Sequence, residues 1–304
     1  MSEQTLCSTV PDTRKPHATA VEIVAVDGHP LRGRVYEPIG RTDATILALP
    51  GIGVPQRVFR HVGDWMAQRG VRLVSVDYRG IGESVTQDGI ATASLSTWAL
   101  ADAVGAFRFV RNRYSTAPIL LGHSFGGQAL GIAEELHGAR AAILVGSQLG
   151  HPHHWDGLSR LKVELLWRAL LPVTTRLFDP IPKWVVGEEL PGGVAREWLS
   201  WGRSDDWLMT HIEGADARYA SFSHPILAYA ISDDDIAPPR AVDDLLRRFT
   251  SADVTRVDIT PEALGKTSIG HVGLFRPTNT ARIWAHWLRF TRENNNHDYR
   301  NQTS

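Results

Sequence analysis

The sequence predicts an α/β protein with a mainly parallel sheet that helices cover on both faces. Segments of strand character alternate with segments of helical spacing over residues 21–147 and again over residues 225–291. The strands are nearly continuous apolar runs, as in PILLG at 118–122, which is typical of strands buried on both faces. Residues 148–224 lack strand character and interrupt this alternation. We therefore expect one sheet-based core that carries an insertion.

The first stretch of alternation begins with two strands inside residues 21–37, which the turn signal Asp27-Gly28 divides. Helices are indicated where apolar residues recur at helical spacing, as Trp98, Ala101 and Val104 do. The further elements expected here are strands at 45–49, 71–80, 118–122 and 141–146, and helices at 59–69, 97–113 and 125–137.

The insertion at 148–224 is expected to be helical. It holds six of the ten tryptophans, namely Trp155, Trp167, Trp184, Trp198, Trp201 and Trp207. Helical stretches at 158–171 and 192–202 are separated by joints rich in proline. After the insertion we expect strands at 225–232 and 253–260, and helices at 239–249 and 279–291.

The composition is that of an ordinary globular enzyme and excludes several classes of partner. Of the 304 residues, 43% are hydrophobic and 21% are charged, and the formal net charge is −1. This balance gives no attraction to nucleic acid or anionic membranes, and no apolar run is long enough to span a membrane. The polar segment 1–20 lacks the apolar core of a signal peptide and is expected to be flexible, and 292–304 is a polar C-terminal tail. With Cys7 as its single cysteine, the chain fits the reducing cytoplasm.

Ser124 is the candidate nucleophile. It lies in GHSFG at 122–126, between an expected strand and an expected helix. In the G-x-S-x-G elbow a serine sits on a strained strand-to-helix turn, and the flanking glycines avoid collisions with neighbouring chain. The alternative is a glycine-rich turn whose serine only caps the helix.

A reactive serine needs a base, and the base needs an acid that orients it. In this architecture the acid and the base follow the serine in that order. His271 fits the base because it lies in a loop between the last strand and the last helix. The acid should follow the strand at 225–232, where Asp233, Asp234 and Asp235 stand together. The pattern acid–x–aliphatic–x–proline favours Asp234, with Asp235 and then Asp233 as alternatives.

The oxyanion hole needs two backbone N–H groups. One is expected from Phe125, directly after the nucleophile. The other should come from the loop PGIGV at 50–54, with Ile52 preferred over Gly51.

Five motifs together resemble the α/β-hydrolases, in particular a bacterial group of predicted serine hydrolases similar to esterases and lysophospholipases. In chain order these motifs are LPGIGVPQRVFR, VDYRGIGES, GHSFGG, DDIAPP and IGHVGLFR. The resemblance covers about residues 20–290 and includes GEELPGGVAREWLSW, which is similar to the cap of that group. It implies an eight-stranded, mostly parallel sheet with a helical cap after the sixth strand. It also implies a triad of Ser124, Asp234 and His271. Pro50-Gly51 replaces the His-Gly of many relatives.

The tryptophans of the insertion could line an apolar acyl or aromatic pocket, or pack among short helices. The candidates for the pocket are Trp155, Trp167, Trp198 and Trp201. The histidine-rich stretch HPHHWD at 151–156 lacks the fixed spacing of a zinc site, so we expect no metal and no cofactor. We expect Arg79, in the loop beside the nucleophile, to pair with a carboxylate.

These features predict a serine hydrolase that acts on a small, apolar ester or thioester. Two alternatives stay open: a transacylase or cyclising enzyme of specialised metabolism with the same triad, and a ligand-binding protein without catalysis. A dehalogenase is disfavoured because it would need aspartate in place of Ser124. An aminopeptidase would need an acidic group in the cap, for which Glu188, Glu189 and Glu197 are the candidates.

Overall fold

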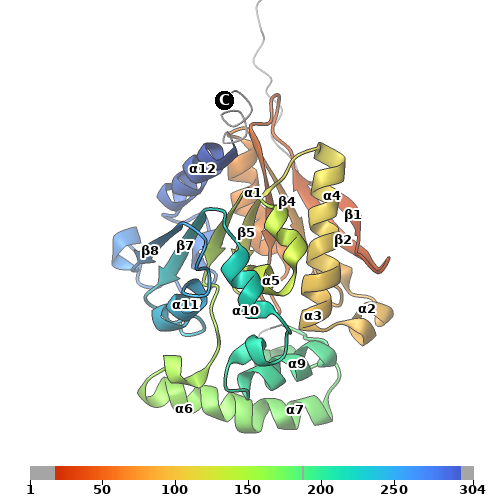
Figure 1. The fold of residues 1–304 in the computed structure, drawn as a ribbon, viewed down its shortest axis with the longest axis vertical. Helices are drawn as coiled ribbons and strands as arrows, with labels where there is room; N and C mark the ends of the chain where they lie inside the picture. The colour runs from red at the N-terminus through yellow and green to blue at the C-terminus, as the bar shows by residue number, and fades with distance from the viewer. Residues whose placement is uncertain (1–17, 187, 296–304) are drawn as a thin grey trace, which may run out of the picture.

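An eight-stranded sheet forms the centre of the molecule (Figure 1). The computed structural model describes residues 18–186 and 188–295. In chain order the strands are β1 (Ala18–Val24), β2 (Pro30–Tyr36), β3 (Ala44–Leu49), β4 (Val71–Val76), β5 (Ile119–His123), β6 (Ala141–Val145), β7 (Ile226–Ile231) and β8 (Val254–Ile259). They lie in the order β1-β2-β4-β3-β5-β6-β7-β8. β2 is antiparallel to both of its neighbours, and the other neighbours pair in parallel. The predicted fold is confirmed in strand number and direction.

Helices cover both faces of this sheet. Outside residues 151–214, the helices are α1 (Arg60–Ala67), α2 (Gln87–Thr92), α3 (Leu95–Thr97), α4 (Val104–Tyr114), α5 (Phe125–Ile132), α10 (Ala215–Ser221, within the predicted insertion), α11 (Pro239–Leu246) and α12 (Ala281–Asn295). α1 and α12 pack on one face, and α4, α5, α10 and α11 pack on the other. β3 shows why both faces are apolar: Leu47 and Leu49 join one core cluster, whereas Ile46 and Ala48 join the other.

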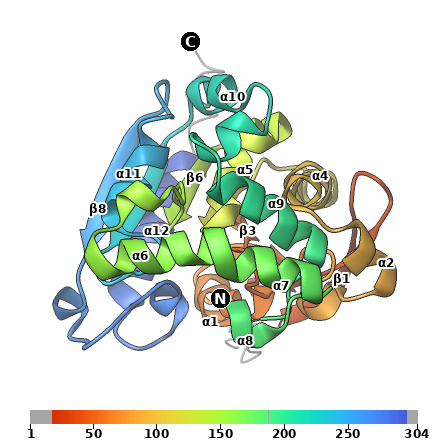
Figure 2. The ribbon, with the colours of Figure 1, turned by 90° about the horizontal axis from the view of Figure 1, so that it is seen from below.

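The segment between β6 and β7 lies across one end of the sheet, where the parallel strands finish (Figure 2). Its helices are α6 (Gly157–Leu165), α7 (Leu171–Leu177), α8 (Lys183–Val186) and α9 (Gly192–Gly202). A π-helical turn over Leu166–Leu170 joins α6 to α7, and Figure 2 shows the pair as one long helix. We call the segment from His151 to Gly214 the cap.

After the cap, α10 returns the chain to the start of β7. It packs against α5, where the Tyr219 hydroxyl donates to the backbone carbonyl of Gln128 at 2.7 Å. Gly131 permits this approach, because a Cβ there would lie 2.1 Å from the Tyr219 ring. α10 is therefore the crossover helix that a parallel β6–β7 connection requires.

Several element boundaries differ from the prediction. α2 forms where a loop was expected, because Thr86 caps its first turn by accepting from the N–H of Gly89. β1 begins at Ala18, inside the segment 1–20 that was expected to be flexible. The rest of that segment and most of the predicted tail 292–304 lie outside the described residues. Within the described ranges, no helix is both long and apolar enough to cross a membrane.

Candidate active site

Ser124 stands on the sharp turn between β5 and α5. Its backbone has φ 52° and ψ −116°, a strained conformation for a residue with a side chain. Two hydrogen bonds hold the turn: the Ser124 N–H donates to the carbonyl of Val145, and the Gly127 N–H donates to the carbonyl of Ser124, both at 3.0 Å. The strain is thus maintained by β6 on one side and by the first turn of α5 on the other.

The glycines around Ser124 are required by close packing of the backbone. A Cβ on Gly122 would lie 2.6 Å from the backbone nitrogen of Gly127. A Cβ on Gly126 would lie 2.1 Å from the carbonyl oxygen of Leu49 in β3. These contacts give the physical reason for the G-x-S-x-G pattern, because any side chain at either position would push the elbow away from the sheet.

His271 and Asp234 meet across two loops. The His271 Nδ1 and the Asp234 Oδ2 are 2.7 Å apart, and the Asp234 side chain is fully buried. The other carboxylate oxygen accepts from the N–H groups of Ile236 and Ala237, both at 2.9 Å. Since the carboxylate can only accept, His271 donates from Nδ1 and keeps Nε2 free to accept a proton.

The two aspartates beside Asp234 face other partners. Asp233 accepts from the Ser268 hydroxyl at 2.9 Å and from the N–H groups of Ile269 and Gly270 at 2.8 and 3.2 Å. Burial raises the pKa of Asp233, but these hydrogen bonds outweigh it and hold the pKa below its usual value. Asp235 is exposed. Of the three, Asp234 alone contacts the imidazole.

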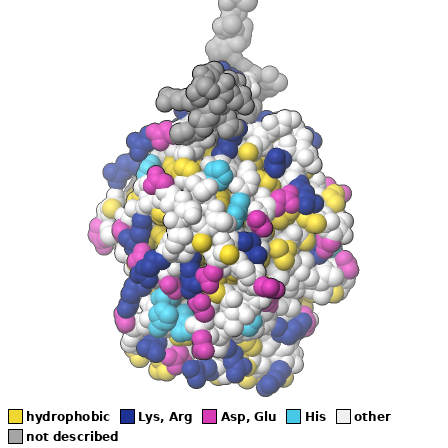
Figure 3. Space-filling model, in the orientation of Figure 1, with side chains coloured by type: hydrophobic (Ala, Val, Ile, Leu, Met, Phe, Trp, Pro, Cys, Tyr) yellow, Lys and Arg dark blue, Asp and Glu magenta, His cyan; other side chains and the backbone are white. Residues whose placement is uncertain are grey.

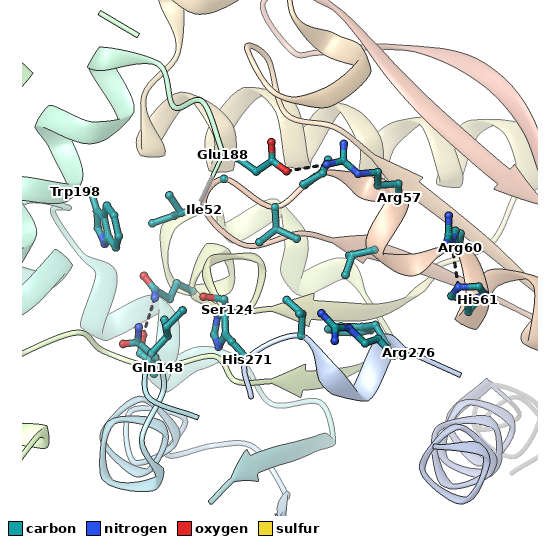
Figure 4. A pocket seen from close by; sticks show the side chains of 18 residues that line it. Ile52, Arg57, Arg60, His61, Ser124, Gln148, Glu188, Trp198, His271 and Arg276 are labelled. Carbon is teal, nitrogen blue, oxygen red and sulfur yellow. Dashed lines mark hydrogen bonds and ion pairs between the residues drawn. The ribbon is translucent and has the colours of Figure 1, made fainter. Parts of the chain in front are cut away.

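Ser124 and His271 both line a cavity of about 780 Å³. Figure 4 shows the Ser124 side chain against the His271 ring, with Gln148 and Trp198 on one side and Arg276 on the other. The structure thus brings the three residues of the predicted triad into one site.

His123 packs against His271, a contact that the sequence did not predict. Its ring lies 4.6 Å from the His271 ring between centroids, and its Nε2 lies 3.0 Å from the His271 carbonyl oxygen. Burial, together with the nearby charge of His271, lowers the pKa of His123 well below its usual value. His123 is therefore neutral, so it can donate to that carbonyl without adding a second positive charge under His271.

Both predicted oxyanion donors flank the serine. Phe125 begins α5, where a backbone N–H has no partner within the helix. Ile52 lines the same cavity as Ser124. Gly51 is equally close to the reaction centre, because a Cβ on it would lie 2.9 Å from the Ser124 Cβ. The loop after β3 therefore passes directly beside the nucleophile.

Only one of the four candidate pocket tryptophans lines this cavity. Trp198 does so, whereas Trp155, Trp167 and Trp201 are buried in packing. Trp167 contacts Trp198 edge to face at 5.0 Å between centroids, and Trp201 contacts Phe125 at 6.4 Å. The Trp155 indole donates to the carbonyl of Asp235 at 2.8 Å. These placements correct the prediction and leave Trp198 as the pocket residue.

Arg79 pairs with two carboxylates, as predicted. Its guanidinium lies 2.6 Å from Asp102 and 2.7 Å from Asp27. The contact with Arg79 lowers the pKa of Asp27 to about 2. The Trp98 indole donates to the Arg79 carbonyl at 3.0 Å, and the Trp98 ring lies within 6.1 Å of the Phe125 ring. The network therefore fixes the loop after β4 beside the elbow.

One group of described residues has the arrangement of a metal site, away from Ser124. The ligand atoms of His153, His154 and Asp244 lie within 4.8 Å of one another, and Figure 3 shows histidine side chains gathered at the surface between α11 and α6. The donor set, two imidazoles and one carboxylate, is suited to a divalent transition metal. This cluster could not be predicted from the spacing within HPHHWD, because its carboxylate, Asp244, comes from α11, far away in the chain.

Comparison with known proteins agrees with this geometry. The family model described as serine aminopeptidase, S33 matches residues 40–197, just over half of the chain. No curated protein sequence matches significantly.

Solved structures show the same fold at low identity. A thermostable carboxyl esterase from Bacillus coagulans in complex with glycerol is 13% identical, with a TM-score of 0.60 over 91% of this chain and 99% of that chain. An esterase from Thermogutta terrifontis with malate bound is 16% identical, with a TM-score of 0.57 over 91% and 100%. DcsB in complex with its substrate analogue is 18% identical, with a TM-score of 0.60 over 91% and 100%. The strained serine elbow, the eight-stranded sheet and the family match lead to one assignment: this chain belongs to the serine aminopeptidase S33 family of α/β-hydrolases, a family of serine hydrolases.

Proposed function

We propose that the protein hydrolyses a carboxylic ester or thioester through an acyl-enzyme on Ser124. The observation that carries this proposal is the 2.7 Å contact between His271 and a buried Asp234, beside a serine held on a strained turn. With Nδ1 bonded to Asp234, the Nε2 of His271 is the nitrogen left to act on the neighbouring serine as a general base.

The reaction has two halves. In the first, the Ser124 Oγ attacks the carbonyl carbon while His271 Nε2 accepts its proton, and the N–H groups of Phe125 and Ile52 receive the oxyanion. Collapse of the tetrahedral intermediate expels an alcohol or thiol, which takes the proton from His271. In the second, water attacks the acyl-enzyme with His271 again as base, and the acid product leaves with Ser124 restored.

The charges in the pocket favour an ester over a peptide with a free amino terminus. Glu188 is the only acidic residue among those that line the described cavity, and it is paired with Arg57 at 2.7 Å. Glu197 is also engaged, because it accepts from the Ser96 N–H at 2.9 Å. Glu189 lines a separate, smaller cavity. A substrate ammonium group would therefore meet no free carboxylate in the described part of the pocket.

A fluorophosphonate probe and a series of p-nitrophenyl esters of graded acyl length test the proposal. We expect a stoichiometric adduct on Ser124, and loss of both labelling and esterase activity in Ser124→Ala. Failure of the probe to modify active protein at Ser124 would rule the mechanism out. Product analysis with added alcohols and amines distinguishes hydrolysis from the alternative in which the acyl group passes to another acceptor.

A further inference from the structure

The cavity that holds Ser124 is positively charged at one end and uncharged at the other. Arg57, Arg60, His61 and Arg276 lie at the charged end, and Trp198, Ile52 and Gln148 lie at the opposite end (Figure 4). We propose that the substrate ester carries an anionic group, a carboxylate or a phosphate, which Arg276 and Arg60 bind. This inference rests on the proposed function and adds the class of substrate.

Two of the three arginines are available for a ligand. Arg57 is neutralised by Glu188 of the cap at 2.7 Å. Arg60 donates from Nε to the His61 Nε2 at 3.0 Å. Within the ranges that the structure describes, no carboxylate forms an ion pair with Arg60 or Arg276. Unpaired guanidinium groups beside a cavity recognise planar anions through two parallel hydrogen bonds.

The surroundings strengthen the positive charge at this end. Burial lowers the pKa of Lys266, and the nearby charge of Arg276 lowers it further, so a second cationic side chain stands close to Arg276. Asp64 opposes this charge only weakly. Burial raises the pKa of Asp64, which lies near His61 and Arg60, by more than their charges lower it, but Asp64 does not line the cavity. The free cationic groups therefore outweigh the acidic ones.

The position of the catalytic residues between the two ends dictates the shape of the substrate. In Figure 4, Ser124 and His271 lie between Trp198 and Arg276. A molecule with its carbonyl at Ser124 would extend an apolar group towards Trp198 and a charged group towards Arg276. An amphipathic ester or thioester with an anionic end meets both requirements, whereas a neutral, wholly apolar ester leaves the arginines without a partner.

Matched pairs of substrates, one with and one without an anionic group, test this inference. In the first pair the anion is in the acyl group: mono-p-nitrophenyl adipate is anionic and p-nitrophenyl hexanoate is neutral. In the second pair it is in the leaving group: 4-hexanoyloxybenzoate is anionic and 4-hexanoyloxybenzamide is neutral. In the third pair, hexanoyl esters of glycerol phosphate and of glycerol compare a phosphate with a neutral alcohol. We expect kcat/KM to favour the anionic member of at least one pair about tenfold or more. Added salt should reduce this preference because the arginines are exposed.

Arginine variants identify the groups responsible. In Arg276→Gln and Arg60→Gln the ratio of kcat/KM for the anionic substrate to kcat/KM for its neutral partner should fall about tenfold. Arg41→Gln is the matched control, because this exposed arginine lies just before β3, at the opposite end of the parallel strands from Ser124. Equal preference in wild type and both variants would overturn the inference.

Binding and labelling separate this inference from the proposed function. Monomethyl adipate should bind Ser124→Ala more tightly than dimethyl adipate does, as measured by calorimetry, and Arg276→Gln should abolish the difference. Labelling of Ser124 by the fluorophosphonate without any charge preference would leave the hydrolase proposal standing and refute the anion site. Absence of labelling together with charge-selective binding would refute the hydrolase instead.

Discussion

Asp233, Asp234 and Asp235 are adjacent in the chain, yet each carboxylate has a different environment. Asp234 is buried against His271, Asp233 holds the backbone of residues 268–270, and Asp235 is exposed. Asp234 therefore acts on the imidazole directly, whereas Asp233 positions the loop that carries it. The same side-chain chemistry gives three roles because the chain turns sharply here.

The first prediction concerns this difference. Asp234→Asn should lower kcat by about 10³–10⁴-fold, because an amide stabilises the imidazolium poorly and can favour the wrong tautomer of His271. Asp235→Asn, the matched control one residue away, should change kcat less than about twofold, since exposed side chains contribute little. Similar losses in both variants, measured with a p-nitrophenyl ester, would contradict the assignment of Asp234.

His123 provides a second prediction, on the pH dependence of stability. Its pKa in the folded protein lies well below the usual value of 6.5, so below pH 6.5 the unfolded chain binds a proton that the folded chain does not. The free energy of unfolding should fall with decreasing pH by about 1.4 kcal/mol per pH unit from this group. His123→Gln keeps a donor for the His271 carbonyl and removes the titration.

Urea unfolding between pH 6.5 and 5 measures this effect. The difference in unfolding free energy, wild type minus His123→Gln, should decrease as the pH falls. A difference that stays constant over this range would show that folding does not lower the pKa of His123.

Site residues could be predicted from the sequence where a motif fixes the backbone. They could not be predicted where their position depends on the packing of segments far apart in the chain. Ser124, Asp234 and His271 follow from a turn pattern and from chain order. The support by His123 depends on its burial under a loop almost 150 residues later in the chain, and no local pattern reports that contact. Whether each of the four tryptophans lines the cavity or is buried likewise depends on how the short cap helices pack. An apolar side chain suits a pocket and a core equally well.

The helix α9 carries two tryptophans in different environments. Trp198 is partly exposed and lines the cavity, whereas Trp201, one turn later, is fully buried against Phe125 and Trp207. α9 is anchored to the core through Glu197, which accepts from the backbone N–H of Ser96 at the start of α3. One helix thus links the wall of the pocket to the packing behind the elbow.

The third prediction compares these tryptophans. Trp201→Ala should lower the free energy of unfolding by about 3–5 kcal/mol, because it leaves a large void in the core. Trp198→Ala should cost less stability and should instead alter KM across the series of acyl lengths. Thermal unfolding and the p-nitrophenyl ester series provide the two measurements, and a reversal of the two effects would contradict their assigned positions.

Element boundaries were harder to predict than element types. The helix expected at 97–113 begins at Leu95 and includes a π-helical turn over Trp98–Ala103 before α4. This widening keeps Trp98 and Asp102 buried at the contact with Arg79. Hydrophobic spacing reports the face of a helix, but it does not report a local change of pitch that a buried ion pair stabilises.

Across the whole molecule, Arg79 connects three separate parts of the chain. It joins the turn between β1 and β2 through Asp27, the π-helical turn before α4 through Asp102, and the loop after β4 in which it lies. The Arg79 side chain is 2% exposed and the Asp102 side chain 0%. A charge this deeply buried is stabilised by its partners and is costly when a partner is removed.

The fourth prediction follows from that burial. Arg79→Met should lower the free energy of unfolding by about 3–5 kcal/mol, since it leaves Asp102 buried without a cation. Adding Asp102→Asn should recover part of this loss, because the amide oxygen can still accept from the backbone N–H of residue 79. Chemical denaturation of the single and double variants provides the test, and no recovery in the double variant would refute an electrostatic origin.

The return of the chain through α10 has a consequence for how such proteins diversify. β6 and β7 are paired neighbours, and α10 alone completes the connection between them. Residues 151–214 lie outside this connection, so another segment whose ends return to α10 could take their place, provided that it restored the packing that Val194, Trp201 and Trp207 give to the core. The replacement would have to cover the core residues that the cap now contacts, among them Phe125, Gln128 and Ser96. A recombination event within this stretch could give the chain a new substrate in a single step and leave its chemistry in place.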